Sequence, residues 1–192
     1  MAPGVRVILT ICCAVALSAC SAGTLSSTGS GEAFKGITPG QPPAGWGQVT
    51  TPSGDAVLAY PSSFRPVRSD PGSVTVATGT APHVYDGYIN VTPRQGKEEL
   101  HGFAAFRLDR LGDEDTAVHE IAAAENVAFV GAVGSCVNDD YRTRVGDNHY
   151  EELACLVAGR HSEYVIVASA RLGDWDRFAS TLRTALAAFK VS

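Results

Sequence analysis

No stretch of this sequence has the length that a membrane-spanning helix needs. The longest apolar run, Val7 to Ala19, contains only thirteen apolar or small residues, whereas a helix that crosses a bilayer needs about 20. The run follows a short segment, Met1–Arg6, with a single positive charge. Length and position together predict a cleaved export signal over residues 1–19 rather than a spanning anchor.

Positive charge is also scarce. The chain has 15 Lys and Arg against 20 Asp and Glu, a formal net charge of −5. Loss of the leader removes Arg6 and makes the chain more acidic still. Proteins that bind nucleic acid gather basic side chains on one face, so we expect no nucleic-acid partner.

The short motifs of common enzyme classes are missing. There is no GxSxG elbow, P-loop, GxGxxG or HExxH. His119-Glu120 begins like the zinc-protease motif, but position 123 is alanine and the second ligand is absent. None of the five histidines has a partner at ligand spacing, and Ser135 has no identifiable base. We therefore expect no catalytic set, no metal and no cofactor.

The acidic clusters do not complete a metal site either. Asp113-Glu114-Asp115, with Asp109, lacks the glycine and the terminal glutamate of a calcium loop. A solvated loop after a helix is the simpler interpretation. The same interpretation applies to Asp139-Asp140.

What the sequence does contain is Leu17-Ser18-Ala19-Cys20 at the end of the leader. A large aliphatic residue three positions before a cysteine, with small residues between them, is typical of a bacterial lipobox. We expect Cys20 to carry the lipid, which places the chain on the extracytoplasmic face of the cell membrane. Acyl chains hold a protein by about 0.8 kcal/mol per buried methylene. The alternative is an ordinary secretory signal cut near Ala19, which leaves Cys20 a free thiol.

Two cysteines remain after processing. Cys12 and Cys13 leave with the leader and Cys20 takes the lipid, so Cys136 and Cys155 are left as an even pair. Disulfides persist in exported proteins, and closing a loop of this length contributes about 3 kcal/mol. We predict a Cys136–Cys155 disulfide, with two buried free thiols as the alternative.

Composition divides the mature chain into two parts. Residues 20–44 are rich in Ser, Gly, Thr and Pro, with Phe34 and Ile37 as the larger apolar residues. Such a segment buries too little surface to offset its ordering entropy, so we expect a lipidated, flexible tether. Residues 45–192 are long enough for a single domain with a proper core.

The domain contains mainly β-strands. Alternation predicts strands over 46–51, 55–60, 73–78, 85–92, 127–137, 150–158 and 163–170. Turns are expected at Pro52-Ser53-Gly54, Gly146-Asp147 and Gly159-Arg160. The last three strands then form an antiparallel meander with Cys136 opposite Val157. A bulge, or a turn shifted by one residue, brings Cys136 opposite Cys155.

Two amphipathic helices complete the prediction. One covers 97–111, and the other follows Asp174 as N-cap, with Asp176 in its first turn. Residues 117–123 suit a helix or a strand. The strand over 163–170 is apolar on both sides and should be covered twice. The expected fold class is α+β, an antiparallel sheet flanked by two helices. The apolar stripes of the helices are Leu100, Phe103, Ala104, Leu108 and Leu111, and Trp175, Phe178, Leu182, Ala185, Leu186 and Phe189.

Trp46, the Pro52-Ser53-Gly54 turn, Ala59-Tyr60-Pro61 and Phe64 resemble the opening of PsbP-like domains, and Phe189-Lys190-Val191 resembles their ending. The middle resembles small actinobacterial lipoproteins of unknown function, of LpqN type. It includes Gly134-Ser135-Cys136-Val137, Asp139, Tyr141, Tyr150-Glu151-Glu152 and Cys155-Leu156-Val157. The resemblance covers about residues 46–191. It implies an α/β sandwich and a binding or assembly role.

These observations favour a non-enzymatic binding or assembly module of the cell envelope, anchored through Cys20, with another envelope protein as a possible partner. The alternatives are a cell-wall hydrolase or a carrier of a small hydrophobic ligand, each with a site that the sequence does not reveal. Tyr85, Tyr88, Tyr141 and Tyr150 are candidates for a recognition surface, because amphipathic aromatics suit interfaces. Half-buried strand positions explain them equally well.

Overall fold

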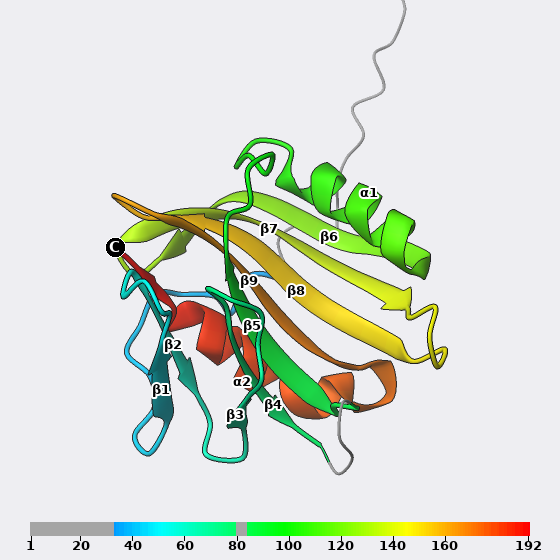
Figure 1. Cartoon of the computed structure of the whole chain (residues 1–192), viewed down its shortest axis with the longest axis horizontal. Helices are drawn as coiled ribbons and strands as arrows, with labels where there is room; N and C mark the ends of the chain where they lie inside the picture. The colour runs from blue at the N-terminus through cyan, green and yellow to red at the C-terminus, as the bar shows by residue number, and fades with distance from the viewer. Residues whose placement is uncertain (1–32, 80–83) are drawn as a thin grey trace, which may run out of the picture.

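The computed structural model describes residues 33–79 and 84–192. These residues form two antiparallel sheets and two α-helices (Figure 1). The larger sheet has the order β3-β4-β5-β9-β8-β7-β6. Its strands are β3 (Arg65–Val67), β4 (Val74–Thr78), β5 (Gly87–Pro93), β6 (Thr116–Phe129), β7 (Ala132–Arg142), β8 (His149–Ala158) and β9 (Glu163–Arg171).

A second, three-stranded sheet has the order β1-β2-β10, from Gly47–Thr50, Ala56–Tyr60 and Lys190–Val191. The single sheet predicted from the sequence is therefore wrong in this respect, and β3 and β10 were not predicted. Alternation tells which face of a strand is buried, but not which strand lies beside it. The α+β class and the antiparallel pairing are confirmed.

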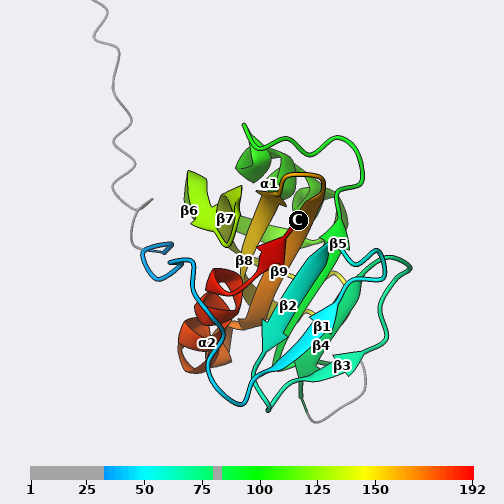
Figure 2. The ribbon, with the colours of Figure 1, turned by 90° about the vertical axis from the view of Figure 1, so that its left-hand side faces the viewer.

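The two helices lie on opposite faces of the seven-stranded sheet. Helix α1 (Phe103–Glu114) packs on β6, β7 and β8, whereas α2 (Trp175–Ala187) packs on β9 and β2 (Figures 1 and 2). Val165 and Val167 of β9 face the α1 side, and Ile166 and Ala168 face α2. The double cover predicted for 163–170 is thus confirmed. Within the described ranges, neither helix is long and apolar enough to cross a bilayer.

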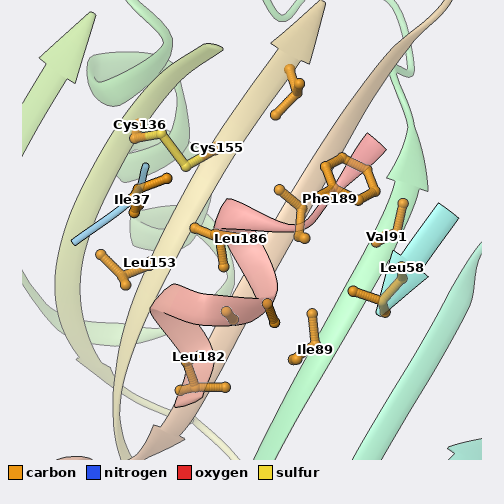
Figure 3. Packing of buried hydrophobic residues seen from close by; sticks show 14 of the residues in the cluster. Ile37, Leu58, Ile89, Val91, Cys136, Leu153, Cys155, Leu182, Leu186 and Phe189 are labelled. Atoms are coloured by element: carbon orange, nitrogen blue, oxygen red, sulfur yellow. A yellow bond between two sulfur atoms is a disulfide. The ribbon is translucent and has the colours of Figure 1, made fainter. Parts of the chain in front are cut away.

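The larger core lies on the α2 side of the sheet. Leu182, Leu186 and Phe189 are fully buried there against strand residues such as Ile89 and Leu153 (Figure 3). Full burial of such side chains contributes about 1.5–3 kcal/mol each. The same core joins the small sheet to the large one, since Leu58 of β2 belongs to it.

The predicted meander is present with its turns shifted by one residue. Arg142 pairs with His149, and Ala158 pairs with Glu163, so the turns centre one position away from Gly146-Asp147 and Gly159-Arg160. The shift sets Cys136 directly opposite Cys155. The two residues form a disulfide with Cα atoms 4.1 Å apart, and both are fully buried in the α2-side core.

The edge of the sheet departs from prediction. Residues 127–137 are not one strand, because the chain turns at Val130-Gly131 and continues as β7; Gly131 has the positive φ of 74° that this turn requires. The ambiguous segment 117–123 is a strand. It belongs to β6, whose pairing with β7 is interrupted by bulges. Pairing along β7 overrides the helical preference of its alanines.

Helix α1 begins later than expected, whereas α2 begins directly after Asp174, as expected. Helix α1 starts at Phe103, not near Lys97, because Gly102 lies in the left-handed region with φ 82°. The predicted face is confirmed, with Phe103 and Leu111 buried. Asp174 occupies the N-cap position of α2, but its side chain makes no capping hydrogen bond. A short 3₁₀ turn, Leu172–Asp174, precedes the helix, and the Asp174 carboxylate pairs with Arg177 instead.

The described end of the expected tether is part of the domain. Phe34 and Ile37 are buried in the α2-side core, where Ile37 lies beside the disulfide (Figure 3). The backbone oxygen of Ala33 accepts a hydrogen bond from Arg183, and the N–H of Gly40 donates to Ala187. The boundary predicted at residue 45 is therefore too late, because the two large apolar residues of the segment are buried in the core beside α2.

Candidate functional site

An open cleft of about 860 Å³ lies on the α1-facing side of the seven-stranded sheet. Residues of β4, β5 and β9 form its floor, beside the strands β6 to β8 on which α1 packs most closely. The segment 65–70 and one side chain of α1 form its walls. We call it the tyrosine–arginine cleft. Its lining includes Arg65, Arg68, Asp70, Tyr85, Tyr88, Asn90 and Arg107.

The four tyrosines singled out in the sequence meet at this cleft. Tyr85 and Tyr88 line it, with ring centroids 6.3 Å apart. Tyr150 contacts Tyr88 at 6.2 Å and stacks on Tyr141 at 6.1 Å. The hydroxyls of Tyr88 and Tyr141 are hydrogen-bonded at 3.2 Å, and that of Tyr150 donates to the backbone of Tyr85. Two tyrosines are thus exposed to a ligand and two buried ones fix their position.

Beneath the tyrosines, Arg107 of α1 is bound to a buried acid of β8. Its Nε and Nη2 both donate to Oε1 of Glu152, at 3.0 and 2.7 Å. The Glu152 side chain is fully buried, whereas 24% of the Arg107 side chain remains exposed. Burial lowers the pKa of Arg107, but the charge and hydrogen bonds of Glu152 outweigh it and raise the pKa overall. The guanidinium is therefore held charged at the wall of the cleft.

A second acid lies across from Glu152. Asp139 of β7 pairs with Glu152 in the strand register and is fully buried. Among the described residues, three buried carboxyl oxygens have no hydrogen-bond partner: both side-chain oxygens of Asp139 and Oε2 of Glu152. Burial, and then the charge of Glu152, raise the pKa of Asp139 to about 9. The raised pKa favours the protonated, neutral form of Asp139 at neutral pH.

Burial and the neighbouring Glu152 also raise the pKa values of the two hydrogen-bonded tyrosines, Tyr88 and Tyr141. Burial, followed by the charge of Glu152, raises the pKa of Tyr88 to about 12, and burial also raises the pKa of Tyr141. Both phenols are neutral at physiological pH. The cluster beneath the cleft thus combines the charged Arg107 guanidinium with two neutral phenols and the acid Glu152 that Arg107 binds.

Asp140 points to the opposite face of the sheet from Asp139. Its carboxylate accepts from His149 at 2.8 Å and lies 3.4 Å from His119. Across residues 33–79 and 84–192, no three His, Cys, Asp or Glu side chains come together in a way that could hold a metal ion. The sequence interpretation of Asp139-Asp140 as a solvated pair is wrong for Asp139, because strand alternation turns it into the interior.

The other residues considered from the sequence lie away from the cleft. Ser135 is buried under the start of α1, and Glu114 pairs with Arg110 on the helix surface. Cys20 lies outside the described residues. Sequence reasoning missed Arg65, Arg68 and Arg107, whose only signal is charge on a short strand and on the polar side of a predicted helix.

No family model matches the sequence, and no curated protein matches it. Among solved structures, the chain resembles cyanobacterial PsbP (CyanoP) from Synechocystis sp. PCC 6803. The TM-score is 0.56 at 19% identity, over 78% of this chain and 94% of that one. LpqN, involved in cell envelope biogenesis of Mycobacterium tuberculosis, gives 0.49 at 11% identity, over 77% and 90%. The fold is therefore PsbP-like, as the resemblance implied, and this assignment rests on the cyanobacterial structure.

Proposed function

We propose that the chain is a lipid-anchored module of the cell envelope that binds another envelope component in the tyrosine–arginine cleft, without transforming it. The cleft carries the proposal. It is open, its side chains come from separate strands and α1, and it combines aromatic rings with charged and amide groups. The volume of the cleft is within the range typical of ligand sites, about 300–1,000 Å³.

The envelope location is supported by the sequence and by the disulfide. The lipobox at Cys20 predicts anchoring at an extracytoplasmic surface. The buried Cys136–Cys155 disulfide suits an oxidising compartment. Both observations agree with export of the mature chain.

The shape of the site favours binding over the two alternatives. A carrier of a hydrophobic ligand needs a deep apolar pocket, whereas this cleft is open and polar at its rim. A hydrolase needs a base or nucleophile that reaches the substrate. Asp139 and Glu152 are fully buried and Arg107 engages Glu152. Among the described residues that line the cleft, Asp70 is the one acid and no histidine is present. Arg107 and the tyrosines are groups that position a ligand.

Site-specific photocrosslinking in intact cells tests the proposal. A photoreactive phenylalanine replaces Tyr85 in the cleft or, as a control, the 88% exposed Val145 in the loop between β7 and β8. We expect an envelope adduct at position 85 that is absent at position 145. Purified full-length protein should leave isolated envelopes chemically unchanged. Equal adducts at both positions, or new fragments released from envelope polymers, would overturn the proposal.

A further inference from the structure

We propose, building on the function above, that the tyrosine–arginine cleft recognises an oxyanion, a phosphate or a carboxylate borne on a polar ligand such as a sugar. The inference rests on three observations of the described residues. Arg65 and Arg68 have no protein partner, Arg107 is held in a fixed position, and tyrosine rings line the cleft.

Among the described residues, the two outer arginines of the cleft have no hydrogen-bond or ion-pair partner. Most arginines in the described chain bind an oxygen of the protein, as Arg94 does with Glu163 and Arg142 with Asp147. Arg65 and Arg68 make no such bond to the residues described, and both are exposed at the cleft. Asp70 is the one acid in the lining. In a chain of net charge −5, this is a local positive surface with free donors.

Arg107 supplies the fixed donor of the site. Glu152 holds Nε and Nη2 from below, which leaves Nη1 and the outer edge of the guanidinium for a ligand. A guanidinium locked by a buried acid loses little rotamer entropy when it binds. Protonated Asp139 keeps the buried cluster from adding a second negative charge beneath the cleft.

The rest of the lining suits the polar body of the ligand. Tyr85 has no side-chain hydrogen bond to the described protein and lies half-buried at the cleft, so that its ring and hydroxyl are available for stacking and hydrogen bonding. Asn90 and Thr75 bond to each other on the floor at 2.9 Å. A phosphate or carboxylate takes paired N–H donors of guanidinium groups in short, charge-assisted hydrogen bonds.

Calorimetry and ¹⁵N NMR on the processed, full-length protein in detergent test the inference with four probes. These are glucose 6-phosphate, glucuronate, inorganic phosphate and glucose. We expect the two anionic sugars to bind with resonance shifts at β3, β4, β5 and Arg107, and glucose to bind at least about tenfold more weakly. Stronger binding of one anionic sugar identifies phosphate or carboxylate as the group recognised, and equal binding of inorganic phosphate shows that the sugar adds nothing.

Variants separate the inference from the proposed function. The double variant Arg65→Gln/Arg68→Gln should weaken binding of both anionic sugars by at least about tenfold, whereas Arg160→Gln, on the exposed β8–β9 turn, should not change it. Arg107→Lys keeps the charge near Glu152 and tests the fork geometry. Glucose binding in the cleft as tightly as the anions, or no effect of the double variant, overturns the inference while Tyr85 crosslinking still stands. Loss of that crosslink, by contrast, removes the function itself.

Discussion

Asp139 and Glu152 show how far single residues depend on their neighbours. The two acids face each other across β7 and β8, both fully buried, with one cation beside them. Two buried charges of one sign destabilise a fold unless one is neutralised. Here Arg107 compensates Glu152, and a proton neutralises Asp139. The wall of the cleft therefore depends on both a hydrogen-bonded ion pair and a protonation state.

Asp139 makes stability depend on pH. Its pKa is raised to about 9 by burial and by Glu152, against about 3.9 in an unfolded chain. The folded state therefore binds the proton more tightly. The stabilisation is complete below pH 3.9 and is lost as the pH rises to about 9, by at most about 1.4 kcal/mol per pH unit. We expect Asp139→Asn to flatten urea-unfolding free energies over this window, and Asp109→Asn on the exposed side of α1 to leave the slope intact. An unchanged slope in Asp139→Asn would contradict this assignment.

Arg107 and Glu152 should behave as a coupled pair. Arg107→Met leaves a buried carboxylate without its cation, and we predict a loss of about 3–5 kcal/mol in unfolding free energy. The double variant Arg107→Met/Glu152→Gln should lose clearly less than the sum of the two single variants. Chemical denaturation of the four proteins measures the coupling. Additive losses would show that the two side chains do not stabilise each other.

At the scale of elements, two connections contribute to the α2-side core, one between segments distant in the chain and one between neighbouring strands. The segment 33–37 lies beside α2, far from it along the chain. The disulfide joins β7 to β8 at the same core. The segment 33–37 and the disulfide thus add buried side chains to the core that α2 forms with the sheet.

Segment 33–37 should contribute to stability as core residues do. We predict that Ile37→Ala lowers the unfolding free energy by about 2–4 kcal/mol, because it opens a cavity beside Cys136 and Leu186. Thr38→Ala, an exposed neighbour, is the matched control and should change it by less than about 0.5 kcal/mol. Thermal unfolding monitored by circular dichroism distinguishes the two. Equal unfolding free energies of Ile37→Ala and wild type would show that segment 33–37 does not stabilise the domain and behaves as a tether.

The disulfide should stabilise mainly through the unfolded chain. The cysteines are 19 residues apart, and a loop of this size is worth about 3 kcal/mol in the chain-entropy model. We expect reduced, alkylation-free protein to unfold at a lower urea concentration than oxidised protein. The two forms should keep the same β-sheet signal in far-ultraviolet spectra. Identical midpoints would show that the bond adds nothing beyond the packing of its sulfur atoms.

For the whole molecule, the N-terminal end of the described chain and the tyrosine–arginine cleft lie on opposite faces of the large sheet. The chain enters the domain through residues 33–37 on the α2 side, whereas the tyrosine–arginine cleft opens on the α1-facing side. A lipid at Cys20, as proposed, would join the domain through this α2-side segment. The cleft proposed to bind a ligand lies on the other face of the sheet.

Anchoring itself is tested at Cys20. We expect mass spectrometry of the native protein to show a mature N-terminus at Cys20 with a thioether-linked lipid. Cys20→Ala should leave the membrane fraction, because acyl anchoring contributes about 0.8 kcal/mol per buried methylene and nothing else is proposed to hold the chain. Cys136→Ala/Cys155→Ala, which keeps Cys20, should remain membrane-bound. An unmodified, unprocessed chain in the cytosol would overturn the envelope assignment.

Sequence patterns alone determined the α+β class, the faces of both helices, the doubly covered strand over 163–170 and the pairing partners Cys136 and Cys155. The class, the helix faces and the doubly covered strand follow from alternation and periodicity, which record burial locally, whereas the cysteine pair follows from the cysteine count and the export signal. The division into two sheets, the burial of Phe34 and Ile37, and the meeting of Arg107, Asp139, Glu152 and four tyrosines were decided only by the tertiary structure. They depend on which distant segments become neighbours, and the pattern within any one segment carries no information about that.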